Sequence, residues 1–452
     1  MKRVFAFLLV VIMMAGIFAG CDKKENTPKT ASLNGRELKE YTIVYSQDAP
    51  DYCQRAAAYI QSQVLARTGV ELPVCEAASG AYPHEILVGD TNRTLSNKLD
   101  SDSRKMEFYF TADENHIAMN GDYFIIAAAA YYFVETYIPG KEFQSTIPTN
   151  QITVAQPITQ KAKNFIFLIG DGMGFNHTKL FGAMEVPEDV EFSDGEDQFY
   201  GYYLPYQGSI HTASLSGITD SAAGATALAC GYKTINHYVG KDADSNNLKS
   251  LTELAMEKGM ATAVMSTDQM NGATPAGFSA HAMDRDDTNT IMEGVQEKML
   301  AGTIINCGLH STYAFQEEIT TVLNKVSENE NGFFLMYEEG YIDKFSHSWY
   351  LEDTYFAMIR FNQAIGLYME YAFYHPDTFL IITADHETGG LTFGKSGYPE
   401  FKADGHTGAD VPVFAYGQGA EVFQNYSEEN NEIPKVIAAL WGVNDFGDQS
   451  AE

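Results

Sequence analysis

The sequence is poor in basic side chains: 29 Lys and Arg stand against 60 Asp and Glu, which gives a formal net charge of −31 at pH 7. A chain of this charge repels phosphate backbones, so nucleic acid and anionic membrane surfaces are poor partners on electrostatic grounds. An acidic protein that handles an anionic substrate needs metal ions to reverse the local field. The charge therefore argues against a nucleic-acid-binding protein and makes metal binding a condition for acting on phosphate.

Cysteine is also scarce, with five residues in a chain of 452. No Cys-x-x-Cys pair occurs, so the sequence does not indicate a zinc site built from thiolates. Cys53 and Cys75 fall in one N-terminal region, where an oxidising compartment would allow them to form a disulfide. Two buried thiols are the alternative, and the sequence alone leaves that choice open.

The N-terminus carries an apolar run that is too short for a comfortable transmembrane helix. It follows Lys2 and Arg3 and ends in small residues, an order that predicts a secretory signal peptide over residues 1–20. The end of the run resembles a bacterial lipoprotein cleavage site, so we expect a lipid anchor at Cys21. That anchor would place the protein in the bacterial cell envelope, periplasmic or surface-facing. Polar residues 21–38 then predict a flexible tether.

Residues 39–158 predict a small α/β domain. We expect strands at 41–46 and 85–90, helices at 52–69 and 123–138, and a hairpin at 106–121. This unit resembles the accessory domain that precedes several bacterial glycoside hydrolases, and it carries no catalytic motif. The polar stretch 140–163 is the expected linker to the rest of the chain.

Residues 159–452 have a different sequence pattern, in which short apolar runs that end in polar clusters alternate with helical stretches. Apolar strands separated by helices predict an α/β domain with a mostly parallel sheet that is covered by helices on both faces. Such sheets bind ligands beyond the carboxyl ends of their strands. Five candidate side chains lie at or just past such ends: Asp171, Thr274, Glu338, Asp385 and His386.

The stretch "GITDSAAGATALACG" sets Asp220 beside Ser221 and then continues with small residues. Thr219 or Asp220 can cap a helix and leave Ser221 in its first turn, where free N–H groups and the helix dipole favour an anion. Small residues let a ligand, a metal or another backbone come close. An ordinary capped helix packed on its neighbour is the alternative interpretation.

Further candidate metal ligands follow in the second half of the chain. Asp343 and His347 are four residues apart, which places them on one face if the segment is helical. His406 lies in a loop with glycine on either side of "HT", which allows an imidazole to approach a ligand closely. Asp and His together suit zinc, whereas carboxylate plus hydroxyl suits magnesium.

Six motifs, "LIGDGMG", "TDSAAGATA", "ATPAGFSAHAMDR", "EEGYIDKFSH", "TADHETGG" and "GHTG", occur in the order and approximate spacing found in alkaline phosphatases, over roughly residues 160 to 425. The resemblance implies a hydrolase of small phosphomonoesters that acts through a phosphoserine, with two zinc ions and one magnesium ion. It implies these roles: Ser221 as nucleophile; Asp343, His347 and His406 as ligands of the first zinc; Asp385 and His386 as ligands of the second; Asp171 as a bridge from the second zinc to magnesium; Thr274 and Glu338 as magnesium ligands; and Arg285 as the phosphate-binding residue.

Arginine is rare from residue 159 onward, where only Arg285 and Arg360 occur. Arg360 falls inside an amphipathic helical pattern, which predicts a solvated or snorkelling side chain. Arg285 lies in a polar stretch, and its guanidinium can hold two phosphate oxygens at once. The resemblance further implies that Asp220 orients Arg285.

Two departures from the family pattern modify these expectations. Gly272 stands two residues before Thr274, where the family often has Asp or His. A glycine cannot ligate, so we expect a third metal site that is weaker, more hydrated or loaded with another ion, with Asn271 as a partial substitute. The chain between His386 and His406 is short where many relatives insert a lobe, which predicts an open active-site rim and leaves the family's usual homodimer open.

Two rival functions remain. A phosphodiesterase or another hydrolase of the same superfamily would share most of these ligands, although Thr274 and Glu338 favour a monoesterase, because the third metal site accompanies monoester hydrolysis in this group. A surface glycan-binding lipoprotein is the rival from another class, and the complete ligand set argues against it. Ser221 does not lie in G-x-S-x-G, and spacing assigns it no partner histidine, which argues against a serine esterase.

Overall fold

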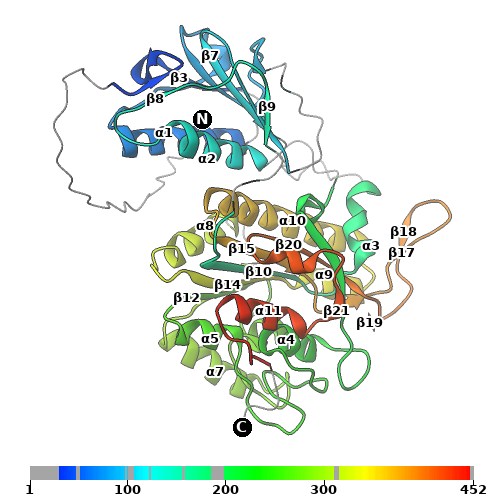
Figure 1. Cartoon of the computed structure of the whole chain (residues 1–452). Helices are drawn as coiled ribbons and strands as arrows, with labels where there is room; N and C mark the ends of the chain where they lie inside the picture. The colour runs from blue at the N-terminus through cyan, green and yellow to red at the C-terminus, as the bar shows by residue number, and fades with distance from the viewer. Residues whose placement is uncertain are drawn as a thin grey trace, which may run out of the picture. The chain divides into compact units, whose positions relative to one another are not determined.

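The chain folds into two compact units, Met1–Ile158 and Thr159–Glu452, in a computed structural model (Figure 1). The structure describes residues 30–447 apart from 47–50, 97–98, 100–105, 122–123, 155–156, 158, 185–197 and 310–314. The predicted signal peptide and the anchor at Cys21 lie outside the described residues. Within the described ranges, no helix combines the length and the apolar character needed to cross a membrane.

The first unit is a six-stranded sheet with two long helices on it. Its strands, in spatial order, are β4 (Val74–Glu76), β3 (Thr42–Tyr45), β5 (Glu85–Val88), β7 (His116–Gly121), β6 (Phe108–Ala112) and β9 (Ile152–Val154). Helices α1 (Asp51–Thr68) and α2 (Ile125–Tyr137) contact each other and the sheet. Gly69 ends α1 at φ 77°, a backbone conformation that glycine adopts without strain. The predicted strands, helices and hairpin of this unit are all present.

Two predicted boundaries of this unit are wrong. The expected tether over 21–38 overlaps two strands, β1 (Ser32–Leu33) and β2 (Arg36–Glu37), because Leu33 is fully buried and anchors the segment. The expected linker over 140–163 contains β9 and β8 (Gln144–Ser145), which pair with β6 and β1. Alternating residues at these sheet edges carry too little apolar character to mark a strand in the sequence.

The four cysteines in the described residues are free thiols. Cys53 is buried on α1, whereas Cys75 is partly exposed on β4. The structure therefore contains no Cys53–Cys75 disulfide.

The second unit is built on an eight-stranded, mostly parallel sheet, as predicted. Its strands, in spatial order, are β13 (Ile304–Cys307), β12 (Ala261–Ser266), β14 (Phe333–Glu339), β10 (Asn164–Gly170), β15 (Thr378–Thr383), β20 (Val411–Tyr416), β11 (Tyr206–His211) and β21 (Ser427–Glu429). Strand β20 runs antiparallel to both of its neighbours. The central strands are buried along their whole length, as expected for a sheet covered on both faces.

Helices cover both faces of this sheet (Figure 1). One face carries α8 (Phe315–Val326) and α10 (Leu351–Tyr374). The other carries α4 (Ser221–Cys230), α5 (Leu251–Glu257), α7 (Thr288–Leu300) and α11 (Glu432–Leu440). Shorter elements lie near the strand ends: α3 (Phe175–Thr178), α6 (Ala273–Gly277), α9 (Tyr341–His347) and the strand pair β16 (Glu387–Thr388) and β19 (His406–Thr407).

Strand register brings the candidate residues to one edge of the sheet. Ile169 of β10 pairs with Glu338 of β14 on one side and with Thr383 of β15 on the other. Ser266, the last residue of β12, also pairs with Glu338. Because these four strands are parallel and end in register, the residues that follow them meet at the same place, the carboxyl edge at which ligands bind in such sheets.

Candidate metal centre

Ser221 is the first residue of α4, and Asp220 is its N-cap. The Asp220 carboxylate accepts a hydrogen bond from the Ala223 N–H at 3.0 Å, which fixes the start of the helix. Ser221 is only 3% exposed, so its hydroxyl lies in a buried position at the positive end of the helix dipole. The prediction that Ser221 occupies the first turn of a capped helix is confirmed.

The small residues after Ser221 allow backbones to pack closely. A Cβ added to Gly224 would lie 3.1 Å from the Cβ of Asp385, and one added to Gly277 of α6 would lie 2.9 Å from the Cβ of Ala225. All ten residues of α4 are buried. The small side chains therefore serve chiefly to bring the segment carrying Asp385 and helix α6 against the serine helix.

Asp171, Asp385 and His386 form a fully buried cluster, which we call the inner cluster. Each offers a ligand atom within 4.8 Å of the others. The Nε2 atom of His386 lies 3.2 Å from Oδ2 of Asp385 and 3.5 Å from Oδ1 of Asp171, and 3.2 Å from the hydroxyl of Ser221. Those two carboxylate oxygens are buried and have no hydrogen-bond partner. Buried, unpaired carboxylate oxygens are costly, and their convergence on one imidazole nitrogen fits a metal cation.

The Ser221–His386 distance also resembles a nucleophile and its general base. The other ring nitrogen of His386, Nδ1, contacts the Thr388 hydroxyl at 3.2 Å instead of a carboxylate. If Nδ1 donates that bond, the lone pair of Nε2 faces two carboxylates, an arrangement that a cation satisfies and a serine-hydrolase triad does not use. The inner cluster therefore supports metal binding over general-base catalysis by His386.

The charge crowding in the inner cluster shifts its pKa values strongly. Burial, and then the charge of Asp385, raise the pKa of Asp171 well above its usual range. Burial and the charge of Asp343 raise the pKa of Asp385 to about 7. Burial and the neighbouring His406 lower the pKa of His386 well below its usual value. A bound divalent cation would favour the ionised acids and the neutral imidazole, which are the forms that ligate.

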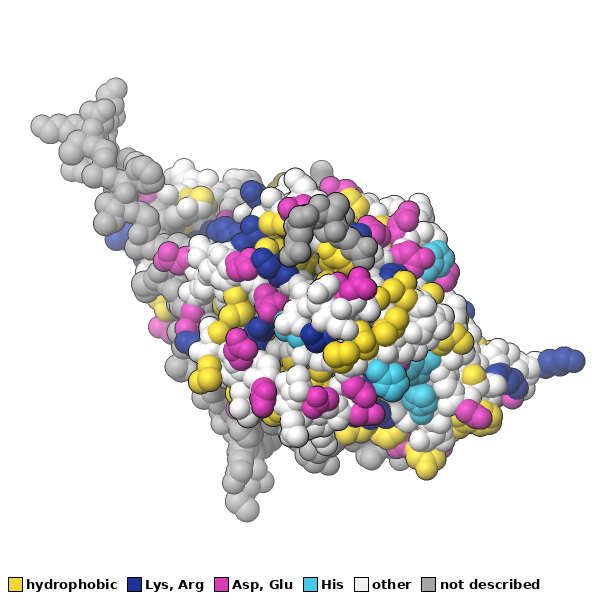
Figure 2. Space-filling view, turned by 90° about the horizontal axis from the view of Figure 1, so that it is seen from below, with side chains coloured by type: hydrophobic (Ala, Val, Ile, Leu, Met, Phe, Trp, Pro, Cys, Tyr) yellow, Lys and Arg dark blue, Asp and Glu magenta, His cyan; other side chains and the backbone are white. Residues whose placement is uncertain are grey.

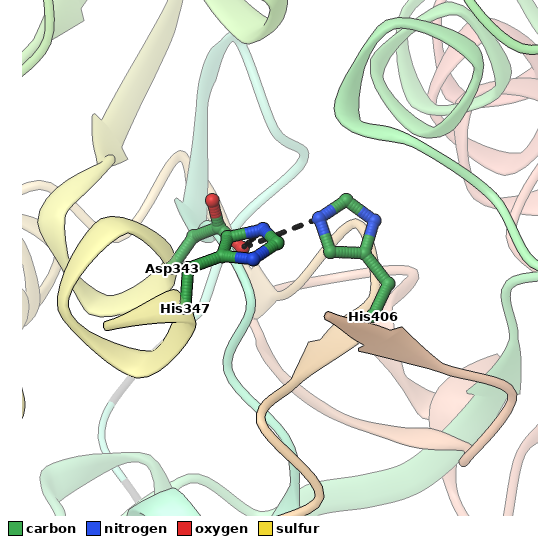
Figure 3. Close-up of side chains that lie close together, drawn as sticks. All are labelled: Asp343, His347 and His406. Atoms are coloured by element: carbon green, nitrogen blue, oxygen red, sulfur yellow. Dashed lines mark ion pairs between the residues drawn. The ribbon is translucent and has the colours of Figure 1, made fainter. Parts of the chain in front are cut away.

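Asp343, His347 and His406 form a second group, which we call the rim cluster (Figure 3). The Nε2 atoms of both histidines lie 3.4 Å from Oδ1 of Asp343. Asp343 and His347 come from the same face of α9, as predicted from their spacing, whereas His406 comes from β19. The three side chains point toward one another from opposite sides, as Figure 3 shows.

Each rim histidine is oriented by a backbone carbonyl. His347 Nδ1 donates to the Asp404 carbonyl at 3.1 Å, and His406 Nδ1 donates to the Thr219 carbonyl at 2.8 Å. A carbonyl only accepts, so both histidines carry a proton on Nδ1 and direct Nε2 toward Asp343, where a bound cation would take the place of an Nε2 proton. Such support of the remote ring nitrogen is the usual surrounding of a metal-ligating histidine.

Thr388 connects the two clusters. Its hydroxyl lies 2.5 Å from Oδ1 of Asp343, to which it donates, and 3.2 Å from Nδ1 of His386. The pKa of Asp343 lies below its usual range: burial raises it, but the hydrogen bond from His406 and the histidine charges outweigh burial. One threonine therefore fixes a ligand candidate in each cluster.

Glu338 and Thr274 lie together beside the end of β12. Burial, and then the charge of Asp268, raise the pKa of Glu338 to about 8, and the neighbouring hydroxyls of Ser266 and Thr274 oppose this shift. The Thr274 hydroxyl is buried and makes no hydrogen bond of normal geometry. The sequence prediction placed these two residues at one site, and the structure brings them together.

Arg285 lies beside the start of α4, where its guanidinium is 3.3 Å from Oδ2 of Asp220. Its side chain is 31% exposed, so part of the guanidinium remains available to a ligand. The same Asp220 carboxylate accepts from the backbone N–H of His237 at 3.0 Å. The expectation that Asp220 orients Arg285 agrees with this geometry.

The prediction for Arg360 is wrong. Its guanidinium forms a two-contact ion pair with the buried carboxylate of Glu339, at 2.6 Å and 2.5 Å, and is not a solvated group. Glu339 ends β14 and is fully buried, so it needs a charged partner. The helical pattern located Arg360 on α10 but did not show that a sheet carboxylate faces it.

Three residues that the sequence prediction missed surround the candidate ligands: Asp268, Lys344 and Thr388. Asp268 follows the end of β12 directly, so the strand-end rule applied to Asp171 would also have found it. Its carboxylate pairs with Lys344 on α9. Thr388 lies two residues after His386 within the motif "TADHETGG", but no role is predicted for it from the sequence.

The model of the family described as "Alkaline phosphatase" matches residues 162–307 and 308–401, more than half of the chain. The chain belongs to the alkaline phosphatase family. The match includes every predicted site residue except His406, which lies just beyond it. The family is metal-dependent, and the protein is a hydrolase of the alkaline phosphatase superfamily.

Curated relatives are about a quarter to a third identical to this chain over the aligned residues. Alkaline phosphatase 3 of Bacillus subtilis is 24% identical over 408 residues, which cover 61% of this chain and 88% of that protein. Alkaline phosphatase of Escherichia coli is 35% identical over 133 residues, covering 27% of this chain and 26% of that protein.

Solved alkaline phosphatases have the same fold. The enzyme of the Antarctic bacterium TAB5 is 27% identical with a TM-score of 0.53, covering 62% of this chain and 98% of that one. A variant of the TAB5 enzyme with magnesium bound in its M3 site is 25% identical, again with a TM-score of 0.53, covering 64% of this chain and 99% of that one.

Proposed function

We propose that the protein hydrolyses phosphomonoesters through a phosphoserine on Ser221. One observation carries the proposal: the buried Ser221 hydroxyl lies 3.2 Å from His386 in a cluster of unpaired carboxylate oxygens, with Arg285 beside the same helix. A nucleophile, a cation site and an anion-binding arginine thus converge at one helix N-terminus.

The residues fit two zinc ions and one magnesium ion. His347, His406 and Asp343 would hold the first zinc, and Asp385 and His386 the second. Asp171 would lie between the second zinc and the magnesium, to which Glu338 and Thr274 supply oxygens. When bound, these ions would lower the pKa of the serine hydroxyl and neutralise charge on the phosphoryl group and the leaving oxygen.

The protein's own residues then perform two displacements. Arg285 holds two non-bridging phosphate oxygens, and the serine oxygen attacks phosphorus as the bond to the leaving alcohol breaks. Water next attacks the phosphorus of phosphoserine, which restores the Ser221 hydroxyl and releases inorganic phosphate. The N-terminal N–H groups of α4 and the helix dipole favour the anion throughout.

The rim cluster bears on which ester is accepted. The His347 side chain is 40% exposed. Figure 2 shows a face of the molecule on which histidine side chains lie next to acidic and hydrophobic ones. An open rim admits varied leaving groups and does not by itself select monoesters. Support for a monoesterase comes instead from the buried Glu338 and Thr274 pair, the expected third site.

Rates on three aryl esters test the proposal. A phosphomonoesterase hydrolyses an aryl phosphate far faster than the matching bis-aryl phosphodiester or aryl sulfate. Faster cleavage of the diester or sulfate would assign the protein to another branch of the superfamily, and no cleavage of any of them would favour the glycan-binding alternative. Binding of the purified protein to a glycan array then serves as the complementary assay.

We also propose, from the N-terminal sequence, that a lipid at Cys21 anchors the protein in the cell envelope. Mass spectrometry of the protein purified from membranes should show a diacylglyceryl-modified N-terminal cysteine. Cys21→Ala should release the protein into the soluble envelope fraction, and an unchanged distribution would contradict the proposal. Whether the protein forms the homodimer usual in the family is answered by its mass in solution.

A further inference from the structure

The space expected for a side chain at position 272 is filled by Asp268. A Cβ added to Gly272 would lie 2.6 Å from Oδ2 of Asp268 and 3.1 Å from its Cγ. Real Cβ atoms essentially never lie closer than 3.0 Å to another heavy atom, so a side chain at 272 would require the Asp268 carboxylate to shift from its present place. Asp268 reaches this place because it follows the carboxyl end of β12, and Gly272 follows one turn later.

The Asp268 carboxylate lies among the oxygens expected at the third metal site. A Cβ added to Gly340 would lie 3.1 Å from the Cβ of Asp268 and 3.5 Å from Oε1 of Glu338, so these two side chains flank the same point. The Ser266 hydroxyl donates to Glu338 and accepts from the Asp268 N–H, at 2.8 Å for the latter.

Two observations show that this group of oxygens is prepared for a cation. Thr274 is 1% exposed, and its hydroxyl, beside Glu338, makes no hydrogen bond of normal geometry. Lys344 pairs with Oδ1 of Asp268, which leaves Oδ2 as the oxygen directed toward Gly272. One oxygen of Asp268 is thus paired with a lysine, and the other faces Gly272.

We propose that Asp268 supplies the third-site carboxylate that Gly272 cannot, so that Asp268, Glu338 and Thr274 together bind magnesium. This inference rests on the proposed function. Two carboxylates and a hydroxyl are hard oxygen ligands that suit magnesium, with water completing the octahedron. On this proposal, position 268 supplies the carboxylate that the family often carries at position 272, in place of the weakened site and the partial substitution by Asn271 that the sequence predicts.

Magnesium titration of the zinc-loaded full chain by calorimetry tests the proposal. Asp268→Asn keeps the shape of the side chain and removes its charge, and it should weaken magnesium binding about tenfold or more, because affinity depends on ligand charge. Zinc content should stay unchanged. Asn271→Ala is the matched control and should leave magnesium affinity as it is. Unchanged affinity in Asp268→Asn, or loss in Asn271→Ala instead, would overturn the proposal.

A relocation variant separates ligation from a structural role of Asp268. Gly272→Asp alone should lower magnesium affinity, since the new side chain collides with Asp268. Combining it with Asp268→Ala should restore magnesium affinity to within a few-fold of the parent. Failure of the double variant to bind magnesium, with thermal unfolding unchanged, would show that Asp268 acts only as a partner of Lys344.

The titration reads metal binding alone, so its result is independent of substrate. Tight magnesium binding with no hydrolysis of an aryl phosphate would contradict the proposed function and leave the role of Asp268 standing. Hydrolysis of the aryl phosphate by a chain that binds no magnesium would contradict the role of Asp268 and leave the proposed hydrolysis standing.

Discussion

The inner and rim clusters use the same side-chain chemistry in opposite surroundings. Asp385 and His386 are fully buried and follow a central strand of the sheet, whereas the side chains of His347 and His406 are 40% and 14% exposed and come from a short helix and a small strand pair. Strand register fixes the inner cluster, and backbone carbonyls fix the rim cluster. Similar ligands can thus be held either by a rigid sheet or by local hydrogen bonds.

In the proposed mechanism, the buried inner cluster and the more exposed rim cluster would have different tasks. Electrostatic interactions are stronger where water is excluded, so the inner cluster is suited to activating the serine beside it. The rim cluster is open to water, as the leaving alcohol and the hydrolytic water require. The following predictions test this division.

Removing the nucleophile should have the largest effect. Ser221→Ala should lower aryl phosphatase activity by about a thousandfold or more, because no covalent intermediate can form. Metal content and thermal unfolding should not change, since the hydroxyl is not needed to hold the inner cluster together. Radiolabelled phosphate trapped during turnover should appear on Ser221, and label on another residue would contradict the mechanism.

A matched pair of histidine variants tests the two clusters directly. His386→Asn should cost more activity than His347→Asn, by about an order of magnitude, because mutations that perturb metal sites cost about 10–100-fold. Added zinc should partly restore His347→Asn, since that site is open to solvent, and should not restore His386→Asn. Zinc content and rates measured over a zinc series decide this; equal restoration of both variants would remove the distinction between the clusters.

Arg285 lies between the buried helix and solvent, so its loss should have an intermediate effect. Arg285→Ala should raise the inhibition constant for inorganic phosphate about 10–100-fold, the value of one or two charged hydrogen bonds. Asp220→Asn should raise it less, because the arginine then stays but loses its orientation. Unchanged phosphate inhibition in Arg285→Ala would show that the arginine does not contact the ligand.

Glu253 lies outside both clusters, so its removal should have the smallest effect on activity and serves as a control. Burial raises its pKa, but hydrogen bonds from His281 and Lys298 outweigh burial and lower the pKa to about 2. A depressed pKa stabilises the fold above the usual value of 4.5, and this stability is lost as pH falls from there towards 2.

Removing this carboxylate should therefore flatten the acid side of the stability curve. Glu253→Gln should reduce the loss of unfolding free energy between pH 5 and pH 3 by roughly 1–2 kcal/mol, while lowering stability at pH 7. Urea unfolding at the three pH values measures this. Aryl phosphatase activity at pH 7 should be unaffected, and parallel stability curves for the two proteins would contradict the assignment.

Much of the site could be predicted from local patterns. The helical spacing of Asp343 and His347, the capped start at Asp220, and the strand ends before Asp171 and Asp385 follow from short-range rules, and the structure agrees with them. The family resemblance, its polar surroundings and the rarity of arginine together drew attention to Arg285. The errors lie where a distant segment decides: Arg360 faces a sheet carboxylate, and the short strands at 32–37 gain their partners only in the folded unit.

The sequence by itself determined the α/β alternation, the helix and strand types and the set of ligand candidates, because periodicity and motif order are properties of neighbouring residues. Only the tertiary structure decided that Asp268 fills the space at Gly272, that Thr388 joins the two clusters, and that small residues at 222–225 admit another backbone. The last two facts depend on distances between segments many residues apart, which strand register and packing fix. The first depends on the direction that the folded loop after β12 gives to a carboxylate only four residues away.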